Sequence, residues 1–222
     1  PNIMIQKSTL QFLKELKKNN TKEWFDLHRD QYETAKKDFI GFIAELIPKV
    51  AKIDPEIAEV KAKDCLFRIN RDVRFSKDKS PYKPHFGAVL CLKGRKSTYP
   101  SYYIHLEPGG VFVGGGAYSL MPDELQKIRQ EIDYNTKEFL KIVAHKNFKS
   151  IYGEVKGDAL VKPPKGFDDS SEAIKYIKQK QWFAMTNIGD EIVLSEEFQK
   201  RILTAFKALH PLNLFLQKPI LN

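Results

Sequence analysis

The chain has 222 residues, of which 42% are hydrophobic and 12% aromatic, and its formal net charge is +9. A chain of this length and apolar content buries a substantial core, which excludes wholesale disorder. No apolar run approaches the roughly 18 residues that a membrane helix needs, and the first seven residues form no apolar signal-peptide core. We therefore expect a soluble cytoplasmic protein without a membrane partner.

The positive charge is concentrated in one segment, Lys61–Lys96. It holds eleven basic and three acidic residues, and eleven minus three leaves a surplus of eight, against one for the rest of the chain. The charges alternate with apolar residues such as Phe67 and Phe75, which disordered basic tails lack. A local excess of this size concentrates anionic partners around it.

The N-terminal third of the sequence predicts two helical runs. Ser8 with Gln11 forms a capping box for the first, and Thr21 is the expected N-cap of the second, which Asp54-Pro55 ends. The second run carries an apolar stripe with the spacing of one helix face. Its members are Tyr32, Ala35, Phe39, Phe42, Ile43, Leu46 and Val50.

The middle third changes to strand patterns separated by turn residues. Glu107-Pro108-Gly109-Gly110 has Pro and Gly where a tight turn requires them, and Lys93-Gly94-Arg95-Lys96 is the expected tip of the preceding hairpin. The strands are expected at Leu66–Ile69, Phe86–Leu92, Ser101–Glu107, Val111–Gly114 and, further along, Trp182–Ile188.

Helices return in the last part of the chain, and a final helix capped by Ser195 carries a buried stripe. The earlier ones are expected at Pro122–Ile132, Thr136–His145 and Ser171–Gln179, with a loop at 162–166 before the last of them. The sequence thus predicts an α+β fold, with one domain over residues 1–222. We expect a mainly antiparallel sheet of about five strands packed by N-terminal and C-terminal helices.

The densest cluster of functional side chains lies in Phe67–Phe75 and the loop that follows. If this segment is extended, Phe67, Ile69, Val73 and Phe75 share one face, while polar side chains share the other. Arginine forks match phosphate or carboxylate oxygens, and the loop lysines add point charges. The candidate ligand-binding residues are Arg68, Asn70, Arg71, Arg74, Lys77, Lys79, Tyr82, Lys83, His85 and Tyr103.

A second polar face is expected on the strand Ser101–Glu107, where Tyr103, His105 and Glu107 alternate with apolar residues. His105 is the candidate acid or base, with Glu107 or Asp72 to orient it. The cluster His85, His105 and Glu107 could contribute to a zinc site only with a suitable geometry, so we predict no metal. Gly114-Gly115-Gly116 lacks the Lys-Ser/Thr of a phosphate loop and is expected as a bend, so we predict no cofactor.

The runs FRINRDVRFSKDKSPYKPHFGA, YYIHLEPGGVFVGGGAY and PDELQKIRQEI together resemble one family of bacterial and fungal proteins, domain of unknown function family 2461. The resemblance spans the chain from the Phe12 and Trp24 region to the C-terminal helix. It implies a single full-length domain and assigns no catalytic residue.

Three functions remain open at this point. The first is a basic pocket for a small phosphorylated or carboxylated ligand, where the ligand could be hydrolysed or a group transferred. The second is nucleic-acid binding by segment 61–96, with aromatic side chains stacking on bases. The third is an interaction module whose arginines are paired with acidic residues. Confinement of the charge favours the small anion over nucleic acid, and the residues leave open whether the chain is an enzyme.

Overall fold

The computed structural model describes residues 4–221, so the first three residues of the segment examined for a signal peptide lie outside it. Within the described residues, no helix has both the length and the apolar character needed to cross a membrane.

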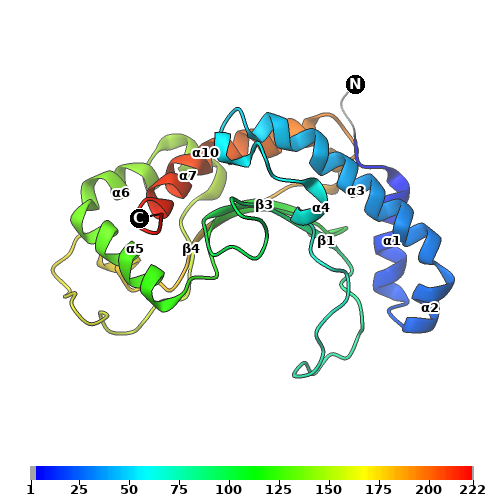
Figure 1. The fold of residues 1–222 in the computed structure, drawn as a ribbon, viewed down its shortest axis with the longest axis horizontal. Helices are drawn as coiled ribbons and strands as arrows, with labels where there is room; N and C mark the ends of the chain where they lie inside the picture. The colour runs from blue at the N-terminus through cyan, green and yellow to red at the C-terminus, as the bar shows by residue number, and fades with distance from the viewer. Residues whose placement is uncertain (1–3, 222) are drawn as a thin grey trace. The chain divides into compact units, whose positions relative to one another are not determined.

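Helices and one sheet make up the regular structure (Figure 1). The α-helices are α1 (Lys7–Lys18), α2 (Lys22–Leu27), α3 (Arg29–Val50), α4 (Ala62–Cys65), α5 (Pro122–Tyr134), α6 (Thr136–Val143), α7 (Lys146–Tyr152), α8 (Ile174–Ile177), α9 (Asp190–Val193) and α10 (Glu197–Gln217), with a 3₁₀ helix at Pro55–Ile57. The strands are β1 (Phe86–Leu90), β2 (Ser101–Leu106), β3 (Phe112–Ala117) and β4 (Trp182–Asn187).

The strands form one open antiparallel sheet in the order β1-β2-β3-β4, which confirms the α+β class. The sheet has four strands rather than about five, because Leu66–Ile69 is not a strand. The chain divides into two compact units. The first unit comprises residues 1–95, 103–113 and 187–203, and the second comprises 96–102, 114–186 and 204–222. The expectation of one domain over the whole chain stays a prediction.

In the first unit, the helix α3 packs on β1. The Phe39 and Phe86 rings stack with centroids 5.6 Å apart, and Phe42 stacks in the same way on Phe198 at the start of α10. The predicted stripe of α3 is confirmed, because all its members except Tyr32 are buried. Burial of large apolar side chains on this helix is what holds it against the strand.

In the second unit, the later part of α10 packs on aromatic residues of the other elements. Phe206 lies 4.8 Å from Tyr102 between ring centroids, and Phe215 lies 5.3 Å from Phe139 on α6. Tyr102 also hydrogen-bonds to His210 on α10. The stripe predicted for the final helix is confirmed, since Phe198, Ile202, Ala205, Phe206 and Leu209 are all buried.

The boundaries of the N-terminal helices differ from the predicted ones where a residue far along the chain contacts the end of a helix. The helix α1 begins at Lys7 rather than after a capping box at Ser8, because Asp38 of α3 accepts from the Gln6 backbone N–H and the Thr9 hydroxyl. Thr21 does cap α2, by accepting from the Trp24 N–H. The second run is divided at His28 into α2 and α3.

The later helices also differ in extent. The helix expected at Ser171–Gln179 is only the four-residue α8, and α7 is an additional helix. The turn Glu107-Pro108-Gly109-Gly110 is confirmed, with a Gly110 N–H to Glu107 carbonyl hydrogen bond of 2.8 Å and Gly109 at φ +80°.

The three consecutive glycines lie inside β3 and in close contact with neighbouring backbone. A Cβ on Gly116 would lie 2.1 Å from the Trp182 carbonyl oxygen, and the residue has φ +121°, which other residues rarely adopt. Gly114 and Gly115 are equally close to the Ala184 and Ser101 carbonyl oxygens. These glycines are therefore required by strand packing.

We expect Gly116→Ala to lower the free energy of unfolding by at least about 2 kcal/mol, because it adds both a steric clash and an unfavourable φ. Gly41→Ala is the matched control, because an added Cβ at that helical position would have no atom within 4 Å apart from its chain neighbours and the backbone of its own helix. It should raise stability by up to about 1 kcal/mol. Urea unfolding followed by circular dichroism measures both, and equal effects would contradict the argument.

Both cysteines, Cys65 and Cys91, are buried thiols and do not form a disulfide. Burial raises the pKa of Cys65 to about 12, with a smaller contribution from Asp64. At pH 8 only about one Cys65 side chain in 10,000 is then a thiolate, the form that reacts. Cys65 should stay unmodified by iodoacetamide in the native chain and react in urea, as peptide mass spectrometry would show. Equal labelling in both states would contradict this.

Candidate functional site

The segment between Leu66 and Ala88 is an irregular arm instead of the expected strand. Two isolated antiparallel bridges hold it, Leu66 to Ala88 and Asn70 to Tyr82. The return side of the arm has two more residues than the outgoing side between these bridges. Two prolines on or beside that side, Pro81 and Pro84, lack the N–H groups that a continuous ladder needs. Residues 70–82 project as a closed loop (Figure 1).

The two-face pattern expected for Phe67–Phe75 does not hold along this arm. Ile69 is buried, but Phe67 is 39% exposed and Phe75 is 97% exposed. Alternation fails because the chain turns at Arg74 and Phe75, with a hydrogen bond from the Ser76 N–H to the Val73 carbonyl oxygen, instead of continuing extended. The loop therefore presents an aromatic side chain to solvent at its outer end.

Most arginines of the arm have local acceptors. Arg71 donates to the Asp78 carboxylate, to the Ser80 carbonyl oxygen at 3.0 Å and to the Ser76 hydroxyl at 3.3 Å. Hydrogen bonds from Ser80, followed by that from Arg71, lower the pKa of Asp78 to about 2. The guanidinium of Arg71 thus links the two sides of the loop by hydrogen bonds.

Arg74 is bound by Asp72, through Nε at 3.0 Å and Nη2 at 2.7 Å. These hydrogen bonds lower the pKa of the Asp72 carboxyl. Asp72 is therefore engaged with its neighbour two residues on, and the contacts of His105 are with other groups. Of the two predicted orienting residues, the structure brings only Glu107 to His105.

The remaining predicted ligand residues of the arm divide into three kinds. Lys79 donates to the Val73 carbonyl oxygen, which fixes the loop, while Lys77 and Asn70 are exposed. Tyr82 is buried against Phe25 with ring centroids 4.0 Å apart, so its ring belongs to the core.

Asn20, which the sequence analysis did not single out, exchanges two hydrogen bonds with the backbone of Tyr82. It thereby anchors the return side of the arm, and no local sequence pattern marks it.

The predicted polar face of β2 is present. Ile104 and Leu106 are fully buried on one face, while Tyr103, His105 and Glu107 lie on the other. His105 Nε2 donates to Glu107 Oε2 at 3.0 Å, and its Nδ1 accepts from the Tyr103 hydroxyl at 3.0 Å. Strand alternation places these three groups in one hydrogen-bonded row.

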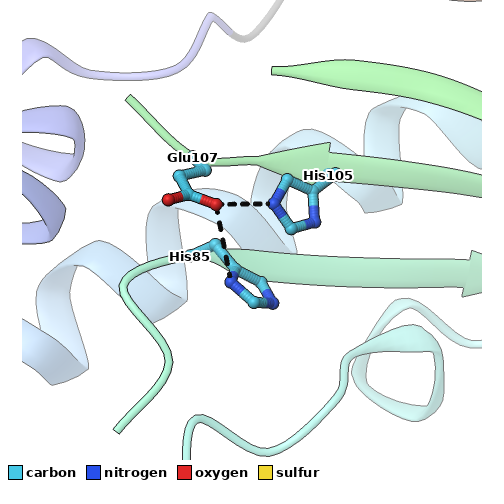
Figure 2. Close-up of side chains that lie close together, drawn as sticks. All are labelled: His85, His105 and Glu107. Carbon is cyan, nitrogen blue, oxygen red and sulfur yellow. Dashed lines mark hydrogen bonds and ion pairs between the residues drawn. The ribbon is translucent and has the colours of Figure 1, made fainter. Parts of the chain in front are cut away.

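His85 joins this row from the residue that precedes β1. Its ring centroid lies 4.1 Å from that of His105, and its Nδ1 lies 3.9 Å from Glu107 Oε2. Figure 2 shows the imidazole of His85 beside His105 and Glu107. Burial, followed by the electrostatic interaction with His105, lowers the pKa of His85 to about 4. His85 is therefore a neutral imidazole at neutral pH. We call His85, Tyr103, His105 and Glu107 the His/Glu cluster.

Two residues outside the predicted set support the His/Glu cluster. Lys17 of α1 donates to Glu107 Oε1 at 3.2 Å. Burial favours protonation of Glu107, but hydrogen bonds from His105 and Lys17 outweigh it and lower the pKa of this carboxyl. Gly87 leaves space for the phenol, because a Cβ there would lie 2.7 Å from the Tyr103 oxygen.

Burial, with a contribution from Glu107, raises the pKa of Tyr103 to about 12, so its hydroxyl stays protonated. It therefore remains able to exchange a hydrogen bond with His105 at any physiological pH.

Arg68 and Lys83 form a second feature beside the His/Glu cluster. Lys83 donates to the Arg68 carbonyl oxygen at 3.0 Å, and its ammonium lies 5.8 Å from the centre of the Phe67 ring. Burial and the charge of Arg68 lower the pKa of Lys83. Within residues 4–221, neither side chain has an ion pair with a carboxylate. The Phe67 ring in turn lies edge-on to Tyr103, 6.3 Å away.

A family model described as a conserved hypothetical protein (DUF2461) matches residues 8–215, nearly the whole chain. The chain belongs to this family. The resemblance carried by the three sequence runs is therefore confirmed. The chain matches no curated protein and no solved structure. Because the family description contains no reaction, the function must be argued from the geometry.

We expect Arg71→Ala to lower the free energy of unfolding by about 1 kcal/mol, because it leaves several loop acceptors without a donor. In a protein of this size that corresponds to a fall in Tm of roughly 2–4 °C. Arg68→Ala is the matched control and should change stability by less than about 0.5 kcal/mol. Differential scanning calorimetry distinguishes them, and an equal loss would show that the pairing of Arg71 has no structural role.

Proposed function

We propose that the chain binds a small phosphorylated or carboxylated molecule beside the His/Glu cluster. In this proposal Arg68 and Lys83 contact the anionic group, and hydrolysis or transfer of a group takes place at the cluster. The predicted acid or base role of His105 belongs to the same proposal. The observation that carries the proposal is that Arg68 and Lys83 lie close together. Among the described residues, no carboxylate forms an ion pair with either side chain.

Arg68 and Lys83 are like charges that lie close together. Burial and then the charge of Arg68 lower the pKa of Lys83, and Lys83 adds a small contribution to the pKa of His85, which burial mainly lowers, so the three groups share one electrostatic environment. A bound anion would remove this repulsion and gain hydrogen bonds to a guanidinium fork. The other arginines differ, because carboxylates of the same loop already hold Arg71 and Arg74.

Aromatic surface beside the cations would receive the rest of such a molecule. The exposed Phe67 ring lies between Lys83 and Tyr103, and His85 is about one quarter exposed at its side chain. A molecule with an anionic end and a less polar remainder fits this sequence of contacts.

Nucleic-acid binding by the loop 70–82 is a second candidate. Phe75 is almost fully exposed, and the Arg74 guanidinium lies 6.0 Å from its ring centre. An exposed aromatic ring among cations is the arrangement on which single-stranded bases stack. The candidates differ in the residues they require, Arg68 and Lys83 for the small anion and Phe75 for nucleic acid.

We expect isothermal titration with inorganic phosphate, nucleotides and sugar phosphates to detect at least one ligand. Arg68→Ala and Lys83→Met should weaken its binding by about 10-fold or more, because each removes a charge-assisted hydrogen bond. Arg74→Ala removes the same charge from a paired position and should change the affinity by less than about twofold.

Two results would contradict the small-anion proposal. One is an equal loss in Arg74→Ala, which would indicate a general charge effect. The other is the absence of any anion binding together with affinity for a single-stranded oligonucleotide that falls steeply with salt and is lost in Phe75→Ala. That second result would establish the alternative function instead.

A further inference from the structure

The His/Glu cluster contains a set of metal-ligand atoms that the proposed function does not require. Across residues 4–221, His85, His105 and Glu107 are the one group of three whose ligand atoms lie within 4.8 Å of one another. His105 lies in β2 and Glu107 is the residue that follows this strand, while His85, which precedes β1, lies beside them (Figure 2). The adjacent strands thus bring these three side chains close together.

The distances fit one ion with little movement. Glu107 Oε2 lies 3.0 Å from His105 Nε2 and 3.9 Å from His85 Nδ1. Bonds of about 2.0–2.2 Å to a tetrahedral ion place the ligand atoms roughly 3.3–3.6 Å apart. A small rotation of the His85 ring, which is the most exposed of the three side chains, closes the remaining distance.

The groups around the cluster can also support the form that a metal requires, in which the proton of His105 is on Nδ1. Glu107 Oε1 is bound by Lys17, which leaves Oε2 to face the two imidazoles. His105 contacts the Tyr103 hydroxyl through Nδ1, so the tautomer with a proton on Nδ1 can donate to Tyr103 and turn the Nε2 lone pair inward. Metal-bound histidines commonly have such a partner on the second ring nitrogen.

The space for Tyr103 is itself specified by the sequence. Only a glycine at position 87 allows the phenol its place, since an added Cβ would lie 2.7 Å from the phenol oxygen. The ligands and the residues that orient them therefore come from α1 and from residues 85–87 and 103–107, all within the first unit.

We propose that His85, His105 and Glu107 bind one divalent transition-metal ion of the Zn²⁺ type. Two imidazoles and one carboxylate favour such an ion over Mg²⁺ or Ca²⁺, which prefer oxygen ligands. Three protein ligands leave a coordination position for water or for a ligand atom. The site goes beyond the proposed function; the one part that rests on it is contact between the ion and the anionic ligand.

The metal site and the acid or base role require different states of the His105 Nε2 atom. In the metal-free cluster Nε2 carries a proton toward Glu107, whereas a bound ion takes the lone pair of that same nitrogen. His105 is then a ligand, and Tyr103 is a positioning residue that acts through it. Measuring metal affinity therefore separates the two roles directly.

The test is titration of the EDTA-treated full chain with ZnCl₂ by calorimetry, with metal content checked by mass spectrometry. We expect one Zn²⁺ per chain. Glu107→Gln and His85→Ala should weaken binding by about 100-fold or more, and Tyr103→Phe by about 10-fold or more. Co²⁺ in place of Zn²⁺ should give the intense visible absorption of a four-coordinate ion, and this absorption should be lost in Glu107→Gln.

His145→Asn is the matched control, because it removes an imidazole but keeps a side-chain acceptor for the Asn147 N–H at the start of α7. It should bind Zn²⁺ as the unmodified chain does, and circular dichroism should show that every variant is folded. The proposal is overturned if the unmodified chain binds no Zn²⁺. It is equally overturned if the Zn²⁺ affinities of Glu107→Gln and His85→Ala stay within about threefold of the affinity of the unmodified chain. A loss of Zn²⁺ affinity in His145→Asn as large as in those two variants would also overturn it.

Arg68→Ala distinguishes this proposal from the previous one. It should bind Zn²⁺ with unchanged affinity while it loses the anion. A chain that binds Zn²⁺ and no anion would contradict only the proposed function, and one that binds an anion and no Zn²⁺ would contradict only the metal site.

Discussion

The pairing of β1 with β2, with one face buried, is the constraint on which the candidate site depends. Ile104 and Leu106 are fully buried, and strand geometry then forces His105 and Glu107 onto the other face. A shift of β2 by one residue would turn an imidazole and a carboxylate toward the apolar core and turn two large apolar side chains away from it. The same register brings His85 within 4.1 Å of His105 between ring centroids, so the core and the polar cluster are specified together.

Much of the positive charge of the irregular arm is bound by acceptors in the same loop. Arg71 and Arg74 are bound to Asp78 and Asp72, each only a few residues away, and Lys79 donates to a backbone carbonyl. This segment lacks a continuous strand ladder, because its prolines have no backbone N–H to donate. The side-chain contacts hold the loop in place of that ladder. The third sequence-based alternative, structural pairing of the arginines, therefore describes Arg71 and Arg74, while Arg68 is left available.

Local patterns in the sequence predict those parts of the fold that local physics decides. The alternation of β2, the turn at Glu107–Gly110 and the stripe of α10 depend on near neighbours, and each is confirmed. Prediction fails where a distant group intervenes. Asp38 displaces the start of α1, and a turn at Arg74 and Phe75 interrupts the alternation of the arm. The contributions of Lys17, Asn20 and Gly87 depend on partners far along the chain, so no periodicity or motif could reveal them.

The charges around the His/Glu cluster link its two proposed ligands. Glu107 places a negative charge 3.9 Å from His85, whose own pKa is affected by Lys83, so this carboxylate opposes an anion drawn in by Arg68 and Lys83. A divalent ion on Glu107 would reverse the sign of the local field, as bound cations commonly do. The anion would then meet positive charge from both sides. Because coupling between two bound ligands is reciprocal, the anion must in turn tighten binding of the metal ion by the same factor.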